Sequence, residues 1–233
     1  DGTELSGLLS ALSTVPGDYW IRMFYCYPNS FTDEVLEVMA SDPRFCRYLD
    51  MPFQHISDPV LKKMNRKITR KEIEATMSRV RSQLPDVAWR TTFSVGFPTE
   101  TDQDFEELVD FVSEGHFQHL GIFLYSDEDN IRSSKFGDPI PLSLKEERKN
   151  RLMEIQQKIS REHHQKMVGS LQQVLVGGFS SETDLLLEGR NQYQGPEVDG
   201  VVYINEGNAT SAGFHQVEIS EANEYDLVGK ILN

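Results

Sequence analysis

The sequence has 233 residues, of which 38% are hydrophobic and 26% charged, and its formal net charge at pH 7 is −14. This composition is typical of a globular protein of one or two domains. It excludes a membrane span, because no apolar run approaches roughly 18 residues, and we find no signal peptide. Two cysteines are too few for a disulfide scaffold or a four-cysteine zinc site, so the expected compartment is the reducing cytoplasm.

Up to about residue 169, segments typical of strands alternate with segments typical of helices. Strands are predicted at residues 20–27, 48–53, 89–95 and 120–125, which are rich in aromatic and branched residues. Helices are predicted to begin at Thr32, Thr69, Thr101 and Ser143, and the last should end at Gly169. Repeated strand–helix units predict an α/β fold, a parallel sheet with helices packed outside it.

After residue 169 the helical spacing ends. Five short strands are predicted at residues 173–179, 184–191, 200–205, 215–220 and 225–232, with turn residues between them. They predict a small antiparallel five-stranded β-barrel, so we place one domain at residues 1–169 and a second at 170–233.

The second domain carries ten acidic residues and only two basic ones, a net charge of −8. A phosphate backbone binds through lysine and arginine, so this domain should repel nucleic acid. A basic polypeptide would be a better partner. The alternative is that the acidic residues form an ordinary solvated surface.

The strand at residues 89–95 suggests where a ligand could bind. Arg90, Thr92, Ser94 and Gly96 share one face of it, and this set is small and polar, whereas the opposite set is mostly apolar. Ligands of parallel barrels gather at the carboxyl ends of the strands, where Gly96 opens a turn whose backbone can approach a flat ligand. The alternative is a salt-bridged arginine followed by a plain glycine turn.

Other candidates lie on the first two strands. Gln54 offers both a donor and an acceptor, as ribose hydroxyls require, and Arg22 could place a guanidinium inside the barrel for a carboxylate. His55 could instead cap the next helix. Cys26 and Cys46 are expected to be small buried hydrophobic residues rather than metal ligands.

These residues belong to a series of short motifs that resembles the radical S-adenosylmethionine (SAM) methylthiotransferases. The motifs are Trp20-Ile21-Arg22, Asp50-Met51-Pro52-Phe53-Gln54-His55-Ile56-Ser57, Met64-Asn65-Arg66, Arg90-Thr91-Thr92, Val95-Gly96-Phe97-Pro98-Thr99-Glu100-Thr101 and Gly121-Ile122-Phe123-Leu124-Tyr125-Ser126. Gly195-Pro196-Glu197-Val198-Asp199-Gly200 continues the match into a barrel that resembles a TRAM domain. Within the family, the motifs at residues 54–57 and 196–200 resemble the RimO type.

The resemblance implies a fold, a reaction and a set of site residues. The fold would be the last four units of a TIM-like (β/α) barrel, followed by the TRAM barrel. The reaction would methylthiolate the β-carbon of an aspartate on small-subunit ribosomal protein twelve, a basic partner, with no role for a membrane. The SAM-binding residues would be Arg22, Gln54, Arg90, Ser94, Gly96, Phe97 and Pro98. The substrate-binding residues would be Tyr125, Glu197 and Asp199.

Two departures from the family pattern affect this interpretation. The Cys-x3-Cys-x2-Cys motif and three further cysteines, which hold two 4Fe–4S clusters in the family, are absent. We expect both clusters to bind outside this chain, which should bind no metal and be inactive alone. Thr99 stands where the family usually has glycine, which would alter the turn near the adenine. The alternatives are a sibling enzyme that methylthiolates transfer RNA and a non-catalytic binding fragment.

Overall fold

The computed structural model describes residues 4–28, 31–127, 134–181, 183–207 and 212–232. They form two compact units, each with its own core. The first comprises Asp1–Phe45 and Leu49–Gln156, and the second Cys46–Tyr48 and Gln157–Asn233. A domain boundary between residues 169 and 170 remains our proposal, because the first strand of the barrel begins at Leu171.

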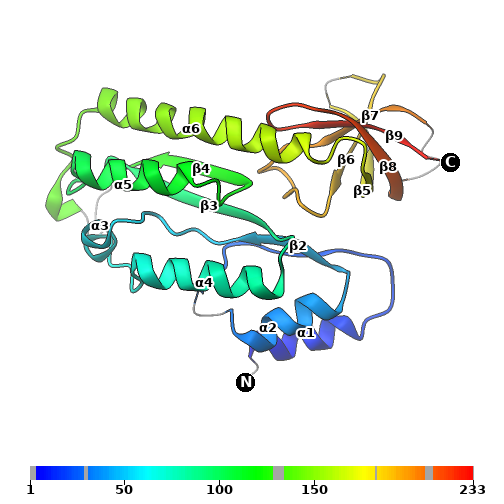
Figure 1. Cartoon of the computed structure of the whole chain (residues 1–233), viewed down its shortest axis with the longest axis horizontal. Coiled ribbons are helices and arrows are strands. Elements are labelled where there is room, and N and C mark those ends of the chain that lie inside the picture. The colour runs from blue at the N-terminus through cyan, green and yellow to red at the C-terminus, as the bar shows by residue number, and fades with distance from the viewer. Residues whose placement is uncertain (1–3, 29–30, 128–133, 182, 208–211, 233) are drawn as a thin grey trace. The chain divides into compact units, whose positions relative to one another are not determined.

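The first unit is a parallel β/α structure whose four strands follow the order β1-β2-β3-β4 (Figure 1). β1 pairs in parallel with β2, β3 pairs in parallel with β4, and a parallel bridge joins Gln54 to Phe93 between the middle strands. The elements are α1 (Leu5–Ser13), β1 (Ile21–Met23), α2 (Asp33–Ser41), β2 (Phe45–Asp50), α3 (Asp58–Lys63), α4 (Arg70–Gln83), β3 (Ala88–Val95), α5 (Asp102–Ser113), β4 (His119–Leu124), the short 3-10 helix η2 (Ser134–Phe136) and α6 (Leu142–Gln165).

Three of the four helices begin at the predicted residues, with Thr32, Thr69 and Thr101 as their N-caps, and two of these starts are closed by side-chain hydrogen bonds. Thr69 and Thr101 both form complete capping boxes, in which each threonine accepts from a backbone N–H and an acidic side chain three residues later accepts in return. At Thr32, which precedes α2, no such side-chain bond forms. The long α6 begins at Leu142 and ends at Gln165, four residues before Gly169. The helices α1 and α3 were not predicted.

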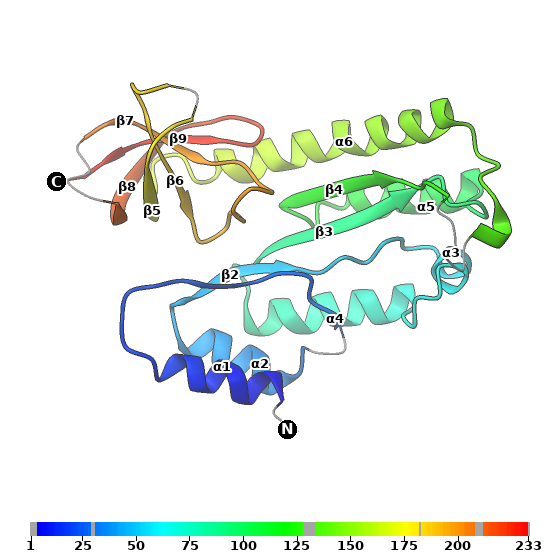
Figure 2. The ribbon, with the colours of Figure 1, turned by 180° about the vertical axis from the view of Figure 1, so that it is seen from behind.

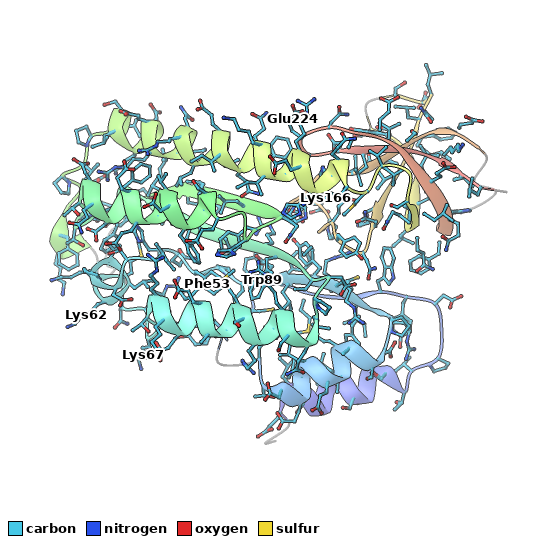
Figure 3. The ribbon with its side chains drawn as sticks, in the orientation of Figure 1. Phe53, Lys62, Lys67, Trp89, Lys166 and Glu224 are labelled. Carbon is cyan, nitrogen blue, oxygen red and sulfur yellow. The ribbon has the colours of Figure 1, made fainter. Side chains whose placement is uncertain are left out.

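The core of the first unit lies between the strands and the helices. Its largest members are aromatic: Phe53 and Trp89 lie 6.1 Å apart between ring centroids, and Phe93 and Phe111 each lie 5.7 Å from Phe117. Figure 3 labels Phe53 and Trp89 between the strands and α4, and Figure 2 shows α4 and α5 running along the strands. This packing covers one face of the sheet.

The second unit contains a closed barrel with the strand order β5-β6-β7-β9-β8. Its strands are β5 (Leu171–Phe179), β6 (Leu187–Asn191), β7 (Val202–Glu206), β8 (Gly213–Ala222) and β9 (Leu227–Ile231). All neighbouring strands are antiparallel except β7 and β9, which pair in parallel. A closed five-stranded barrel was predicted, but the parallel pair within it was not. Across the described residues of both units, no helix is long and apolar enough to span a membrane.

Candidate functional site

The face of the sheet opposite the helices carries the predicted polar residues. On β3, Trp89, Phe93 and Val95 are buried in the core, whereas Arg90 and Ser94 are only half-buried. The register aligns Arg90, Thr92 and Ser94 with His119, Gly121 and Phe123 of β4, which therefore share this face. Gly121 lies beside Arg90 on this face, since a β-carbon on it would lie 3.6 Å from an Arg90 nitrogen. The predicted alternation along β3 is confirmed.

Arg90 is held on this face by an ion pair with β2. Its Nη1 lies 3.0 Å from Oδ1 of Asp50, a carboxylate that is fully buried. The other Asp50 oxygen accepts a hydrogen bond from the backbone N–H of Tyr25, at 3.0 Å. Asp50 therefore orients Arg90 and also the segment that follows β1. The salt-bridged arginine that we considered as an alternative is present, and a second guanidinium nitrogen still points toward Gly121.

Gln54 lies where the segment after β2 passes beside β3. Its backbone N–H donates to the Thr92 carbonyl at 2.9 Å, and its carbonyl accepts from Ser94 at 2.8 Å. Its φ of 74° is in the left-handed region, which is uncommon for a residue other than glycine. Two hydrogen bonds to β3 therefore hold this unusual conformation, and the half-buried Gln54 lies next to Ser94 in the sheet.

Gly96 opens the turn that follows β3, and two features require a glycine there. Its φ is 76°, and a β-carbon would lie only 2.3 Å from Cγ of Lys145, on α6. Lys145 is itself buried, and its Nζ donates to the Tyr125 carbonyl at 2.8 Å and to Asp138. The Lys145 side chain thus packs against the turn and ties it to the end of β4.

The buried carboxylate of Glu100 also fixes the Gly96 turn. Glu100 Oε2 accepts from the Gly96 N–H at 2.9 Å, and Oε1 pairs with Arg148 at 2.6 Å. His55 is fully buried, with Nε2 3.6 Å from Glu100 Oε2, and its Nδ1 accepts from the Ser57 N–H. His55 therefore helps to build the turns at the strand ends, but the residue that caps the next helix is Ser57.

Aromatic rings line the outer side of this turn. Phe97 is buried and lies 5.3 Å from Tyr125 and 6.1 Å from Phe136, in edge-on arrangements. Pro98 and Thr99 complete the turn, and both are half-buried. The Thr99 hydroxyl is buried and has no hydrogen-bond partner within the described part of the chain. The structure therefore brings together Gly96, Phe97 and Pro98, which were predicted to bind SAM, and Tyr125, which was predicted to bind the substrate.

Arg22 lies on β1, next to β2 in the sheet, with its guanidinium 5.8 Å from the Trp20 ring. The neighbouring Ile21 and Met23 pack against the core, so Arg22 points to the face opposite the helices. We therefore place Arg22, Asp50, Arg90 and Ser94 on one polar face.

The two cysteines are free and buried, as predicted. Burial, reinforced by the nearby Asp50 carboxylate, raises the pKa of Cys26 to about 12, so its thiol is unreactive at neutral pH. Among the described residues, no group of three or more histidine, cysteine, aspartate or glutamate side chains is placed to hold a metal ion.

Glu197 and Asp199 lie in the second unit, at a cavity of about 400 Å³. Asp199 Oδ2 accepts from the Gly195 N–H at 2.7 Å, and so it fixes the turn. Glu197 is exposed, with a φ of 65°. Glu188 and Arg190 also line the cavity, so three carboxylates face one guanidinium there. Glu197 is therefore better placed than Asp199 to bind a partner.

Sequence reasoning missed Asp50, Glu100, Lys145 and Arg148 as parts of the site. Each acts through a partner far along the chain, as Arg148 does with Glu100 and Lys145 with Tyr125. Asp50 and Glu100 stand inside the family motifs, which was a usable signal for those two alone.

Comparison with known proteins agrees with both units. Residues 5–112 match the model of the radical SAM superfamily, and residues 168–232 match that of the TRAM domain. The chain is 48% identical over 225 residues to the ribosomal protein uS12 methylthiotransferase RimO of Bdellovibrio bacteriovorus, covering 97% of this chain and 49% of that protein. It is 44% identical to the RimO of Desulfotalea psychrophila, covering 100% of this chain and 53% of that protein. The chain thus spans about half the length of these curated relatives.

Among solved structures, coproporphyrinogen III oxidase (HemN) from Escherichia coli is similar with a TM-score of 0.51. The similarity covers 81% of this chain and 50% of that chain at 14% identity, and it therefore supports the fold alone.

Proposed function

We propose a function on the premise that this chain belongs to the RimO-type radical SAM methylthiotransferases and corresponds to their C-terminal portion. We infer that it binds SAM and the protein substrate in an enzyme that methylthiolates the β-carbon of an aspartate in ribosomal protein uS12. The observation that carries this proposal is the polar sheet face beside the Gly96 turn, within a chain 40–48% identical to RimO proteins.

The first unit offers a fitting site for the adenosyl part of SAM. Gln54 would donate to and accept from the ribose hydroxyls, while Ser94 adds a hydroxyl on the same side of the sheet. The backbone of Gly96, Phe97 and Pro98 would contact the adenine, and the buried Thr99 hydroxyl without a partner in the described chain offers a further polar contact. Arg22 and Arg90 would provide positive charge for a carboxylate.

The chemistry of the parent enzyme would come from groups that this chain does not hold by itself. SAM bound to a 4Fe–4S cluster supplies a 5′-deoxyadenosyl radical, and we place both family clusters outside this chain. The chain's own residues would orient SAM and keep water away from the reacting carbon. The isolated 233 residues are then expected to be inactive. Anaerobic reconstitution tests this, since about four irons per chain would contradict it.

The cofactor assignment is tested in the complete enzyme. We expect Gln54→Ala and Arg90→Gln each to lower the rate of 5′-deoxyadenosine formation at least tenfold, because each removes a polar contact to SAM. Lys158→Ala, on the exposed side of α6, is the matched control and should keep the wild-type rate. Since Arg90→Gln also leaves Asp50 without its ion pair, thermal unfolding is followed for each variant. Wild-type rates in both folded variants would contradict the assignment.

The acidic second unit is proposed to recognise the basic protein substrate. The ten acidic residues within residues 170–233 attract a basic polypeptide at long range, and Glu197 at the cavity offers a contact for lysine or arginine. Affinity for uS12 should fall between 0.05 and 0.3 M salt, as the Debye length shrinks from roughly 14 to 6 Å. Glu197→Lys should weaken binding about tenfold without changing the melting temperature.

Asp199→Asn serves as the comparison for Glu197→Lys. Because Asp199 holds the turn through Gly195, this variant should lower the melting temperature and change affinity for uS12 little. Equal affinity of wild type and Glu197→Lys would remove Glu197 from the substrate site. The sibling function, transfer RNA methylthiolation, would be favoured if this acidic unit bound transfer RNA more tightly than uS12.

A further inference from the structure

A basic surface stands out on the first unit of this acidic chain. Residues 60–71 contain six lysines and arginines and no acidic residue, whereas the whole chain has a net charge of −14. The segment covers the end of α3, the turn after it and the start of α4. We define the α3–α4 basic surface as Lys62, Lys63, Arg66, Lys67 and Lys71, together with Lys135.

These side chains are accessible. Lys62, Lys63, Lys67 and Lys71 are all exposed, and Figure 3 shows Lys62 and Lys67 at the outer edge of the first unit, pointing away from the strands. Asn65, with a φ of 60°, forms the bend between the two helices. The bend spreads the lysines over a curved surface rather than along one helix face.

The acidic residues closest in sequence to this surface already form hydrogen bonds or ion pairs with other groups. Asp58 accepts from the Arg70 N–H at 2.7 Å, Glu72 closes the capping box with Thr69, and Glu74 pairs with Arg70 at 2.8 Å. Arg70 is therefore neutralised and lies outside our definition. The five cations of the segment form no ion pair among the described residues.

Arginines elsewhere in the first unit contrast with this surface. Arg44, Arg79, Arg90, Arg148 and Arg151 all pair with carboxylates within 3.0 Å. In a chain with an excess of acidic residues, lysines and arginines without acidic partners are available to bind an anion from outside the chain.

The surface is continuous with the candidate SAM site. Lys63 lies 5.6 Å and Lys135 5.0 Å from the ring of Phe136, so two cations from distant segments meet at one ring. Phe136 in turn contacts Phe97 in the Gly96 turn. A polyanion on this surface would therefore lie beside the carboxyl ends of the strands.

We propose that the α3–α4 basic surface binds the phosphate backbone of RNA while the adjacent site binds SAM. Lysines spread over a bend suit backbone phosphates without base recognition. The choice of RNA rests on the proposed substrate, a ribosomal protein, which belongs to an RNA particle. An anionic membrane is disfavoured, because none of the exposed large hydrophobic residues of the described chain lies within residues 58–71.

The test is fluorescence anisotropy of the 233-residue chain with a labelled 24-base-pair RNA duplex at 50, 100 and 200 mM KCl. Neutralising about four phosphates would weaken affinity roughly 100-fold over this range. Lys62→Glu/Lys67→Glu should weaken binding at least tenfold at 50 mM. The neutral pair Lys62→Ala/Lys67→Ala should reduce the slope of log K against log salt by about 1.8.

The matched control is Lys158→Glu/Lys166→Glu, which makes the same change of charge at two exposed lysines of the second unit. It should change RNA affinity less than twofold, and circular dichroism should show unaltered melting for all variants. Equal loss in the control, absence of RNA binding by wild type, or tighter binding to vesicles with 30% phosphatidylglycerol would overturn the proposal. None of these results bears on uS12 binding through Glu197. The RNA proposal and the proposed function can therefore fail independently of each other.

Discussion

The two units use their sheets in opposite ways. The first covers one face of an open parallel sheet with helices and large aromatic residues, and leaves the other face for Arg90, Ser94 and their neighbours. The second closes its sheet around a small aliphatic core of valine, isoleucine and leucine. A closed five-stranded barrel has no interior left for a ligand, so its binding residues must lie in loops such as the one at Glu197. The open sheet instead can bind a ligand on the strands themselves.

The largest expected effect tests whether the two cores are independent. Phe93→Ala removes a fully buried ring 5.7 Å from Phe117 and should lower the free energy of unfolding of the first unit by about 3–5 kcal/mol. Calorimetry should show this transition at a lower temperature and the second one unchanged. Ile219→Ala, in the barrel core, should do the reverse. A single transition that both variants lower would contradict independent cores.

A smaller effect is expected from tight packing in the barrel. A β-carbon at Gly229 would lie 2.5 Å from Val217 Cγ1 and 2.7 Å from the Glu218 carbonyl, so Gly229→Ala should cost the second unit about 1–3 kcal/mol. Gly177→Ala is the matched control, since the nearest atom to its β-carbon would be 4.0 Å away. Urea unfolding monitored on the second transition measures both. Equal stability of the two variants would contradict this prediction, because it would show that the barrel can accommodate a β-carbon at residue 229.

The smallest expected effect is the pH dependence of the stability of the first unit that arises from Asp104. Burial opposes ionisation of Asp104, but hydrogen bonds from Ser57 and Thr101 outweigh it and lower the pKa of this carboxyl. A lowered pKa stabilises the folded state above the ordinary value of 3.8, and this stability is lost as pH falls toward the folded-state value. Asp104→Asn should therefore cost about 1 kcal/mol at pH 7 and less at pH 3.

Urea unfolding at pH 7, 5 and 3 measures this difference. Asp110→Asn, exposed on the same helix, is the control and should follow the wild-type curve. A gap between wild type and Asp104→Asn that stays constant down to pH 3 would exclude a role for ionisation of Asp104.

Local signals in the sequence predicted much of the fold. The threonines that begin α4 and α5 and the alternation along β3 depend on residues a few positions apart, and these predictions are confirmed. β2 begins three residues earlier than predicted, because Phe45 and Cys46 are buried in a central strand. The parallel pairing of β7 with β9 depends on chain topology, which strand patterns do not reveal.

The candidate site was predictable only in part. Its face and its turn followed from strand parity and Gly96, whereas the groups that hold them came from distant segments. Asp50 reaches Arg90 from another strand, and Lys145 and Arg148 reach the turn from α6. Such pairings require the tertiary structure, because no spacing in the sequence links their members.

The open sheet also has a consequence for how the chain behaves in concentrated solution. Within the described residues, β4 pairs on one side only, with β3, and it exposes Phe123 by 63%. An unpaired strand edge with an exposed ring is a template on which other copies can add strands. The net charge of −14 opposes this growth by repulsion between copies, and that repulsion vanishes near the isoelectric point of about 4.8. Precipitation should therefore be fastest in mildly acidic, salty buffers.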